Sequence, residues 1–148
     1  MFTGRRTNNM DTKGRVAIPA KHRDVLRERY GSKLMLTVGI EGQCLWLYPM
    51  EEWLEFRARL KSTGLGGRRL IRLQRQMFAS AEALDVDKAG RVLIPENLCD
   101  DAGLEKEVMF VGMDSRIELW SPSAWEAEQV NLSESQDELL EVLDDVQF

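Results

Sequence analysis

The hydrophobic and polar positions of the chain follow one order twice. In the first pass, alternation predicts a short strand with Val16 and Ile18 on one face and Arg15 on the other. A helical pattern follows, in which Pro19 suits the first helical position and Gly31 suits the stop after the last turn. The next segments predict a strand, a hairpin loop and a strand, at residues 34–39, 40–43 and 45–49.

The second pass repeats these elements with small changes in length. Residues 11–19 read DTKGRVAIP and residues 87–95 read DKAGRVLIP, a displacement of 76 positions with three differences in nine. A shorter helical pattern then ends at Gly103, and the strand, loop and strand recur at residues 108–112, 113–116 and 118–122. The period is too long for a solenoid unit and two copies are too few for an array, so the repeat indicates two tandem modules.

Modules of this size are expected to pack on one another, because each alone has little apolar surface to bury. The predicted fold class is α+β, mainly β, with the two modules paired and helices at their flanks. The predicted organisation is a first module at residues 1–53, a helical connector at 54–80, a second module at 81–125 and an acidic tail at 126–148.

The connector and the tail both carry amphipathic patterns. In the connector, GLGG at residues 64–67 separates two apolar helix faces, formed by Trp53, Phe56 and Leu60 and by Leu70, Leu73 and Met77. Arginines at positions 68, 69, 72 and 75 either touch phosphates or keep an exposed helix in solution. In the tail, apolar side chains among carboxylates fit an amphipathic helix that docks on a basic partner surface, or a frayed end.

Charge is divided unevenly between the halves of the chain. The net charge of the whole chain is −5, yet residues 1–76 hold 16 Lys and Arg against 7 Asp and Glu, or +9. Residues 77–148 hold 4 against 18, or −14. Such asymmetry favours a polyanionic partner for the basic half. The alternative is that the two halves are ordinary solvated surfaces that attract one another.

Each copy of the repeated motif begins with residues typical of a turn. In Asp-x-x-Gly, the carboxylate can accept backbone N–H groups two or three residues on, and the glycine supplies a positive φ. Around the first turn, positive charge is expected to gather from Arg5, Arg6, Lys13 and Arg15. An Asp–Arg ion pair that pins the turn in both copies is the alternative role for these residues.

The sequence gives little support to an enzyme. His22 is the only histidine and aligns with Leu98 of the second copy, so we expect a packed helix residue. There is no HExxH, no CxxC, no glycine-rich phosphate loop and no cluster of metal ligands, so no catalytic residue, metal or cofactor is predicted. Acid–base chemistry between Asp11 and Asp87 is a remote alternative.

The remaining features favour a cytoplasmic protein. Cys44 and Cys99 are predicted to be reduced, buried thiols, because they form no spaced pair and do not match between the copies. No apolar run approaches the length needed to cross a membrane, and the first residues have no signal-peptide core. Neither a membrane nor a small-molecule substrate is predicted as a partner.

These motifs resemble those of the MraZ family. The resemblance spans about residues 1–130 and is carried by MFTGRRTNNMDTKGRVAIPAKHR, LWLYPMEEW, DKAGRVLIP, AGLEKEVMFVG and ELWSPSAW. It implies two tandem AbrB-like modules that pair into one swapped-hairpin β-barrel with flanking helices. It also implies a bacterial transcriptional regulator that forms a ring-like homo-oligomer and associates with the nucleoid.

The resemblance further implies a DNA partner and a set of contact residues. The partner is double-stranded promoter DNA, at short G-rich direct repeats upstream of the division and cell-wall gene cluster that includes the regulator's own gene. The DNA-contacting residues of the family fall here on Asp11 and Arg15, and on Asp87 and Arg91. Arg15 is expected to contact a base edge or a phosphate, while Asp11 orients its guanidinium and the turn, which Gly14 helps to form.

Two further expectations concern the surroundings of the motifs. Arg5, Arg6 and Lys13 are expected to contact backbone phosphates beside the first motif. The second motif is embedded in acidic residues at positions 85, 87, 96, 100 and 101, so we expect it to contribute less to DNA contact. The alternative function is an assembly module that does not bind DNA and uses its basic half to bind its own acidic tail.

Overall fold

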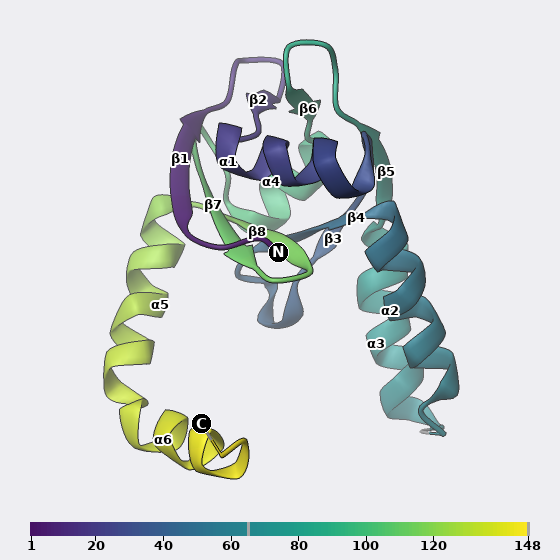
Figure 1. Cartoon of the computed structure of the whole chain (residues 1–148), viewed down its shortest axis with the longest axis vertical. Helices are drawn as coiled ribbons and strands as arrows, with labels where there is room; N and C mark the ends of the chain where they lie inside the picture. Colours follow the sequence, from purple (N-terminus) through teal and green to yellow (C-terminus); the bar gives the residue numbers. More distant parts are fainter. Residues whose placement is uncertain (65, 148) are drawn as a thin grey trace.

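The computed structural model describes residues 1–64 and 66–147 (Figure 1). The strands in this part of the chain are β1 (Arg5–Asn9), β2 (Arg15–Ala17), β3 (Lys33–Val38), β4 (Leu45–Pro49), β5 (Glu82–Asp85), β6 (Arg91–Leu93), β7 (Glu107–Met113) and β8 (Arg116–Trp120). Six of them form an antiparallel sheet in the order β1-β7-β8-β4-β3-β5, while β2 and β6 form a separate antiparallel ribbon. With the helices around this sheet, the predicted α+β class is confirmed.

The strand order has a two-fold pseudosymmetry that follows the sequence repeat. The hairpin β3–β4 of the first half and the hairpin β7–β8 of the second half meet through β4 and β8. Strand β1 of the first half pairs with β7 of the second half, and β5 of the second half pairs with β3 of the first. Each half therefore supplies an edge strand to the hairpin of the other.

The ribbon of β2 and β6 lies at one end of the molecule, at the top of Figure 1. Val16 lies opposite Val92, and both side chains are buried in the main apolar core. Ile18 is buried with them, while Arg15 and Ala17 on β2 remain partly exposed. The alternation predicted for this strand is confirmed.

A helix follows each arm of the ribbon and packs beneath it (Figure 1). Helix α1 (Ala20–Val25) continues as the π-helical turn η1 (Leu26–Tyr30) and ends at Gly31, where φ is 100°. Helix α4 (Glu96–Ala102) is shorter and ends at Gly103, where φ is 64°. Both glycine stops were predicted and are confirmed.

The prediction for Pro19 is wrong by one position. Pro19 precedes α1 as its N-cap, with ψ of 141°, and Ala20 is the first helical residue. Only the carbonyl of Pro19 enters the helix, where it accepts the N–H groups of His22 and Arg23 at 2.9 and 3.0 Å. The proline thus ends the extended segment and starts the helix with its acceptor alone.

The connector forms a helical hairpin on the β4 and β3 side of the sheet. Helices α2 (Met50–Ser62) and α3 (Arg68–Ser80) run side by side (Figure 1). Their predicted apolar faces meet, since Trp53 and Met77 are buried together with Phe56 and Leu73 against them. The predicted break at residues 64–67 includes Leu65, which lies outside the described residues. The four arginines of α3 are exposed, at positions 68, 69, 72 and 75.

The tail is helical and projects from the opposite side of the molecule (Figure 1). Helices α5 (Pro122–Glu134) and α6 (Gln136–Asp145) have no buried residue. The predicted apolar positions are between 37 and 66 % exposed, at Leu132, Leu139, Leu140, Leu143 and Val146. Among the described residues, no ion pair joins this tail to the arginines of α2 and α3. The amphipathic helix of the first alternative is present, without a basic surface of the same chain against it.

Both cysteines are free and buried, as predicted. Burial raises the pKa of the Cys44 thiol to about 12, so it stays protonated at neutral pH. In the part of the chain that the structure describes, none of the helices combines the length and the apolar character required to cross a membrane.

Candidate nucleic-acid interface

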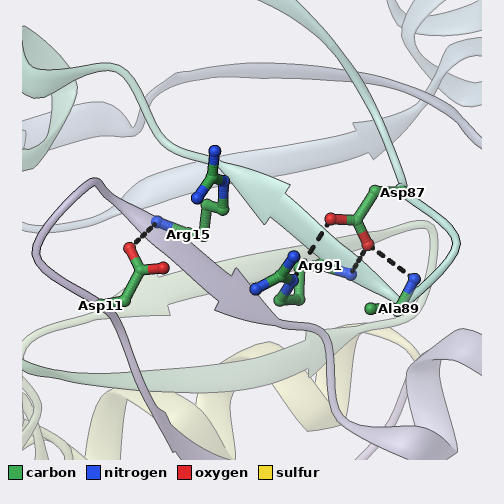
Figure 2. A network of polar contacts seen from close by, with 5 residues as sticks. All are labelled: Asp11, Arg15, Asp87, Ala89 and Arg91. Carbon is green, nitrogen blue, oxygen red and sulfur yellow. Dashed lines mark hydrogen bonds and ion pairs between the residues drawn. The ribbon is translucent and has the colours of Figure 1, made fainter.

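Each copy of the motif forms the same closed turn (Figure 2). In the first copy, Oδ1 of Asp11 accepts the backbone N–H groups of Lys13 and Arg15, each at 2.9 Å. The second copy repeats both bonds at 2.9 Å, from Ala89 and Arg91 to Asp87. The carboxylate was predicted to reach residues two or three positions on, and it reaches the second and the fourth. The carboxylate reaches the fourth residue because strand β2 begins directly after the turn. There the N–H of Asp11 donates to the carbonyl of Arg15 at 2.8 Å, which holds the two residues close together.

The glycines of the two turns hold the ribbon together. Gly14 and Gly90 have φ of 91° and 77°, in the region that disfavours any side chain. The carbonyl of Gly14 accepts the N–H of Ile94, and the carbonyl of Gly90 accepts the N–H of Ile18, both at 2.9 Å. Each turn is therefore fixed to the strand of the other copy.

The pairing of β2 with β6 brings the two motifs side by side. Arg15 lies opposite Leu93, and Ala17 lies opposite Arg91, on the face of the ribbon that points away from the core. Leu93 is 53 % exposed on this face. Two arginines from positions 76 residues apart in sequence thus share one outward surface at the end of the molecule (Figure 2).

The two arginines differ in how they are held. Arg91 turns toward its own aspartate, with 3.3 Å between Nε and Oδ2 of Asp87. Arg15 turns away from Asp11 (Figure 2), and within the described residues its guanidinium has no hydrogen bond or ion pair. The expectation that Asp11 orients the guanidinium of Arg15 does not hold, since Asp11 orients only the backbone. Among the described residues, the pinning ion pair, our alternative for both copies, is present only in the second.

Neither aspartate has the properties of a general acid. The backbone N–H of Arg15, followed by that of Lys13, lowers the pKa of Asp11 below its ordinary value. The backbone N–H of Arg91 does the same for the pKa of Asp87. Both carboxylates are therefore ionised at neutral pH. Among the described residues, no three His, Cys, Asp or Glu side chains are grouped as metal ligands.

The structure does not gather all the predicted cations at the first turn. Lys13 lies in the turn and is exposed, but Arg5 and Arg6 stand at the start of β1. At about 3.3 Å per residue, β1 carries Arg5 roughly 20 Å along the strand from Asp11. The guanidinium carbon of Arg5 instead lies 5.7 Å from the ring centroid of Trp125. Neighbouring strand residues point to opposite faces, so Arg6 faces a different side from Arg5.

The acidic surroundings predicted for the second motif are offset by cations from the first half. Because β5 pairs with β3, Lys33 forms an ion pair with Asp85, with 3.2 Å between Nζ of Lys33 and Oδ1 of Asp85. Helix α1 carries Arg23 to the second turn, where a Cβ on Gly90 would lie 2.6 Å from the Cδ of Arg23. The local sequence of the second motif holds no signal for these neighbours, because they come from more than 50 residues away.

Comparison with known proteins assigns the chain to a family. Residues 1–66 and 77–146 match the family described as "MraZ protein, putative antitoxin-like". The protein named "Transcriptional regulator MraZ" from Lachnoclostridium phytofermentans is 43 % identical over 142 residues, which cover 95 % of this chain and 96 % of that protein. A protein of the same name from Lactobacillus delbrueckii subsp. bulgaricus is 39 % identical over 148 residues, which cover 100 % of both chains. Another, from Shewanella frigidimarina, is 40 % identical over 126 residues, which cover 85 % of this chain and 83 % of that protein.

The names of these relatives describe regulators, so the prediction that the chain is not an enzyme is confirmed at the level of the family. The match to the family and the similarity to these relatives over nearly the full length of the chain agree with the resemblance carried by the repeated motif. The chain belongs to the MraZ family.

Proposed function

We propose that this protein is a transcriptional regulator that binds double-stranded DNA sequence-specifically through the β2–β6 ribbon. The observation that carries the proposal is the pairing of the two turns, which presents Arg15 and Arg91 on one outward surface. A two-stranded ribbon is one of the elements that the major groove of DNA admits. The names of the relatives give independent support to a role in transcription.

The residues of the ribbon divide into two roles in this proposal. Arg15 and Arg91 contact base edges, and guanine is the base whose O6 and N7 atoms suit an arginine. Asp11, Asp87 and Gly14 shape the turns and do not touch bases, since Oδ1 of each aspartate accepts two backbone N–H groups and the carbonyl of Gly14 accepts the N–H of Ile94. Lys13 contacts a phosphate, which fixes the register of the protein on DNA without reading sequence. We assign Arg5 and Arg6 only peripheral phosphate contacts, because they lie along β1 and away from the turns.

We also propose the finer organisation that the family resemblance implies. The pseudosymmetric strand order supports two AbrB-like modules, at residues 1–53 and 81–125, whose exchanged edge strands complete one barrel-like unit. The connector at 54–80 and the tail at 126–148 lie outside both modules. The DNA targets are short G-rich direct repeats upstream of the protein's own division and cell-wall gene cluster, and the protein associates with the nucleoid in the cytoplasm.

The proposed homo-oligomer joins the basic hairpin of one copy to the acidic tail of the next. The exposed arginines of α3 complement the carboxylates of α6 in charge, and the exposed Ile71 and Phe78 of α3 offer apolar surface to the exposed leucines of α6. These two surfaces lie on opposite sides of one chain (Figure 1). Contacts between unlike surfaces generate a ring when the rotation between copies closes. This arrangement accounts for the attraction between the basic and acidic halves and still allows DNA binding. The assembly-only alternative, in contrast, excludes DNA binding.

Binding to the chain's own upstream DNA, compared with shuffled DNA of equal composition, tests the proposal. Affinity is measured over several salt concentrations for the assembled full-length protein. We expect tighter binding to the upstream duplex, with a slope of log K against log salt of about −0.9 for each phosphate contacted. If the assembled protein binds neither duplex at low salt, the assembly-only function is favoured instead.

A further inference from the structure

A cleft of about 380 Å³ lies beside the turn of the second motif. One wall is formed by the helical segment α1–η1, which contributes Arg23 and Arg27, and another by the turn itself, which contributes Lys88. Asp87 and Gly90 also line the cleft. Three cations from two distant parts of the sequence therefore face one space, and among the described residues that line it Asp87 is the only carboxylate.

The cations of the cleft have few partners in the protein. Within the described residues, the buried Nε of Arg23 has no hydrogen-bond partner, and Lys88 makes no ion pair. Arg27 forms one ion pair, with 3.5 Å between its Nη2 and Oδ1 of Asp24. Both side chains of this pair are largely exposed. Exposed pairs of this kind are weak and easily exchanged. A buried donor without a partner is unfavourable, and no ion pair among the described residues balances the charge of Arg23.

The carboxylate of the cleft opposes an anion less than its charge suggests. Oδ1 of Asp87 accepts two backbone N–H groups, and Oδ2 faces Nε of Arg91 at 3.3 Å. Both oxygens are thus directed into the turn and toward a cation. The net charge of the lining residues favours an anion.

The cation cluster of this cleft has no equivalent at the first motif among the described residues. The positions that correspond to Arg23 and Lys88 are Cys99 and Thr12, which are uncharged. Arg27 belongs to the extra helical turn η1, which the shorter helix α4 lacks. The cation cluster is therefore a property of one side of the pseudosymmetric ribbon.

We propose that the cleft formed by Arg23, Arg27 and Lys88 binds a phosphate group, supplied by the DNA backbone next to the base edge that Arg91 contacts. This assignment rests on the proposed DNA-binding function and adds an asymmetric anchor to it. Arginine and lysine side chains hold phosphate oxygens through charge-assisted hydrogen bonds. The anchor fixes which half of the ribbon faces which end of the DNA repeat. A free phosphorylated small molecule is the other source of the same chemical group.

The test uses the full-length protein and the double variant Arg27→Ala with Lys88→Thr, in which Lys88 takes the residue of the first copy. Arg29→Ala is the charge control, on an exposed arginine of the same helical segment that faces the ring of Tyr30 and does not line the cleft. One arm measures the thermal midpoint in inorganic phosphate against chloride at equal ionic strength. The other arm measures affinity for the upstream and shuffled duplexes between 50 and 200 mM salt, with oligomer size checked for every variant.

We expect phosphate to raise the thermal midpoint of the wild type and of Arg29→Ala, and not that of the double variant. The loss of one phosphate contact lowers the magnitude of the slope of log K against log salt by about 0.9. Across this fourfold salt range, the affinity of the double variant therefore changes roughly 3.5-fold less than that of the wild type. Because a phosphate carries no sequence information, the affinities for both duplexes fall by the same factor.

Each other outcome has a distinct meaning. A phosphate-dependent midpoint with an unchanged DNA slope overturns the assignment to DNA and leaves a free phosphorylated ligand. No phosphate effect and no change in slope, with normal wild-type binding to upstream DNA, overturns the cleft and leaves the proposed function intact. A phosphate effect in a protein that binds no DNA overturns the proposed function and leaves the cleft as an anion site.

Discussion

The two copies of the repeated motif have nearly the same backbone and different surroundings. Both turns use an aspartate that accepts two N–H groups at 2.9 Å, and both use a glycine with positive φ. Yet within the described residues the guanidinium of Arg15 has no hydrogen bond or ion pair, whereas Arg91 is held by Asp87. The repeat therefore preserves the scaffold that presents the arginine more strictly than it preserves the contacts of the arginine itself.

The comparison also shows that charge along the sequence is a poor guide to charge around a site. The second motif lies in the acidic half of the chain, but the exchanged strand pairing brings Lys33 and Arg23 of the basic half to it. In the same way, Met10, which precedes the first motif, contacts Cys99 of α4, whose helix carries three acidic residues. Each motif thus lies beside the helix of the other half.

The largest expected effect comes from separating the halves. In residues 1–80 alone, β1 loses β7, β2 loses β6, β3 loses β5 and β4 loses β8, so four strand edges and the sheet core are exposed. We expect this fragment to lack a cooperative thermal transition as a monomer. Calorimetry together with sedimentation measures both properties, with the full-length chain as the control. A monomeric fragment that unfolds cooperatively would show that the halves are independent domains.

A smaller effect distinguishes the two turn glycines. Gly14→Ala places a Cβ 2.8 Å from the carbonyl oxygen of Ile94, which is fixed backbone, whereas Gly90→Ala meets the flexible side chain of Arg23. Strain at positive φ alone destabilises by about 1–3 kcal/mol, and the backbone clash adds to it at Gly14. We expect Gly14→Ala to lower the free energy of unfolding more than Gly90→Ala does.

Chemical denaturation measures this difference. Gly103→Ala is the matched control, because its φ is also positive and nothing lies within 4 Å of the added Cβ. It isolates the cost of a side chain at positive φ from the cost of the added contacts. Equal losses at Gly14 and Gly90 would mean that the two turns are packed alike.

The smallest effect concerns the helices beneath the ribbon. His22 is buried where the second copy has the buried Leu98, and among the described residues neither ring nitrogen has a hydrogen-bond partner. Burial, followed by the charges of Lys21 and Arg6, lowers the pKa of His22 below its ordinary value of 6.5. The unfolded chain then binds a proton more readily than the folded chain as pH falls below 6.5. The free energy of unfolding should therefore decrease as the pH falls from 6.5 through the lowered pKa.

His22→Leu tests this prediction because it gives the first helix the residue of the second. The variant should lose the part of the pH dependence between neutral pH and pH 5 that comes from His22. Denaturation is measured across this range, and Leu98→Met serves as a control that retains the histidine. A pH profile of His22→Leu identical to that of the wild type would mean that His22 does not change its protonation on unfolding.

Much of the local structure could be predicted from the sequence, because its signals are local. The Asp-x-x-Gly turns, the alternation around Val16 and the glycine stops at Gly31 and Gly103 follow from the preferences of a few adjacent residues. The apolar faces of the connector follow from helical spacing for the same reason.

Strands β1 and β5 could not be predicted from the residues they contain. Their sequences, RRTNN and EALD, have little β-propensity, and they become strands because β7 and β3 offer them hydrogen-bonding edges. The same pairing decides which charges surround each motif. The cations of the cleft therefore escaped sequence reasoning, although Arg15 and Arg91 were found by it.

The central claim is that the paired turns read DNA through Arg15 and Arg91. Its most direct test compares Arg15→Ala, Arg91→Ala and the wild type for binding to upstream and shuffled DNA, with the thermal midpoint of each. We predict that Arg15→Ala loses discrimination by about 1–3 kcal/mol per contact, or roughly 5- to 150-fold, at an unchanged midpoint, because its guanidinium has no partner in the described chain. Arg91→Ala should lose less discrimination between the two duplexes, because Asp87 already accepts a hydrogen bond from Arg91 and offsets part of its charge. Full discrimination in both variants, or a collapse of the midpoint in Arg15→Ala, would contradict the account.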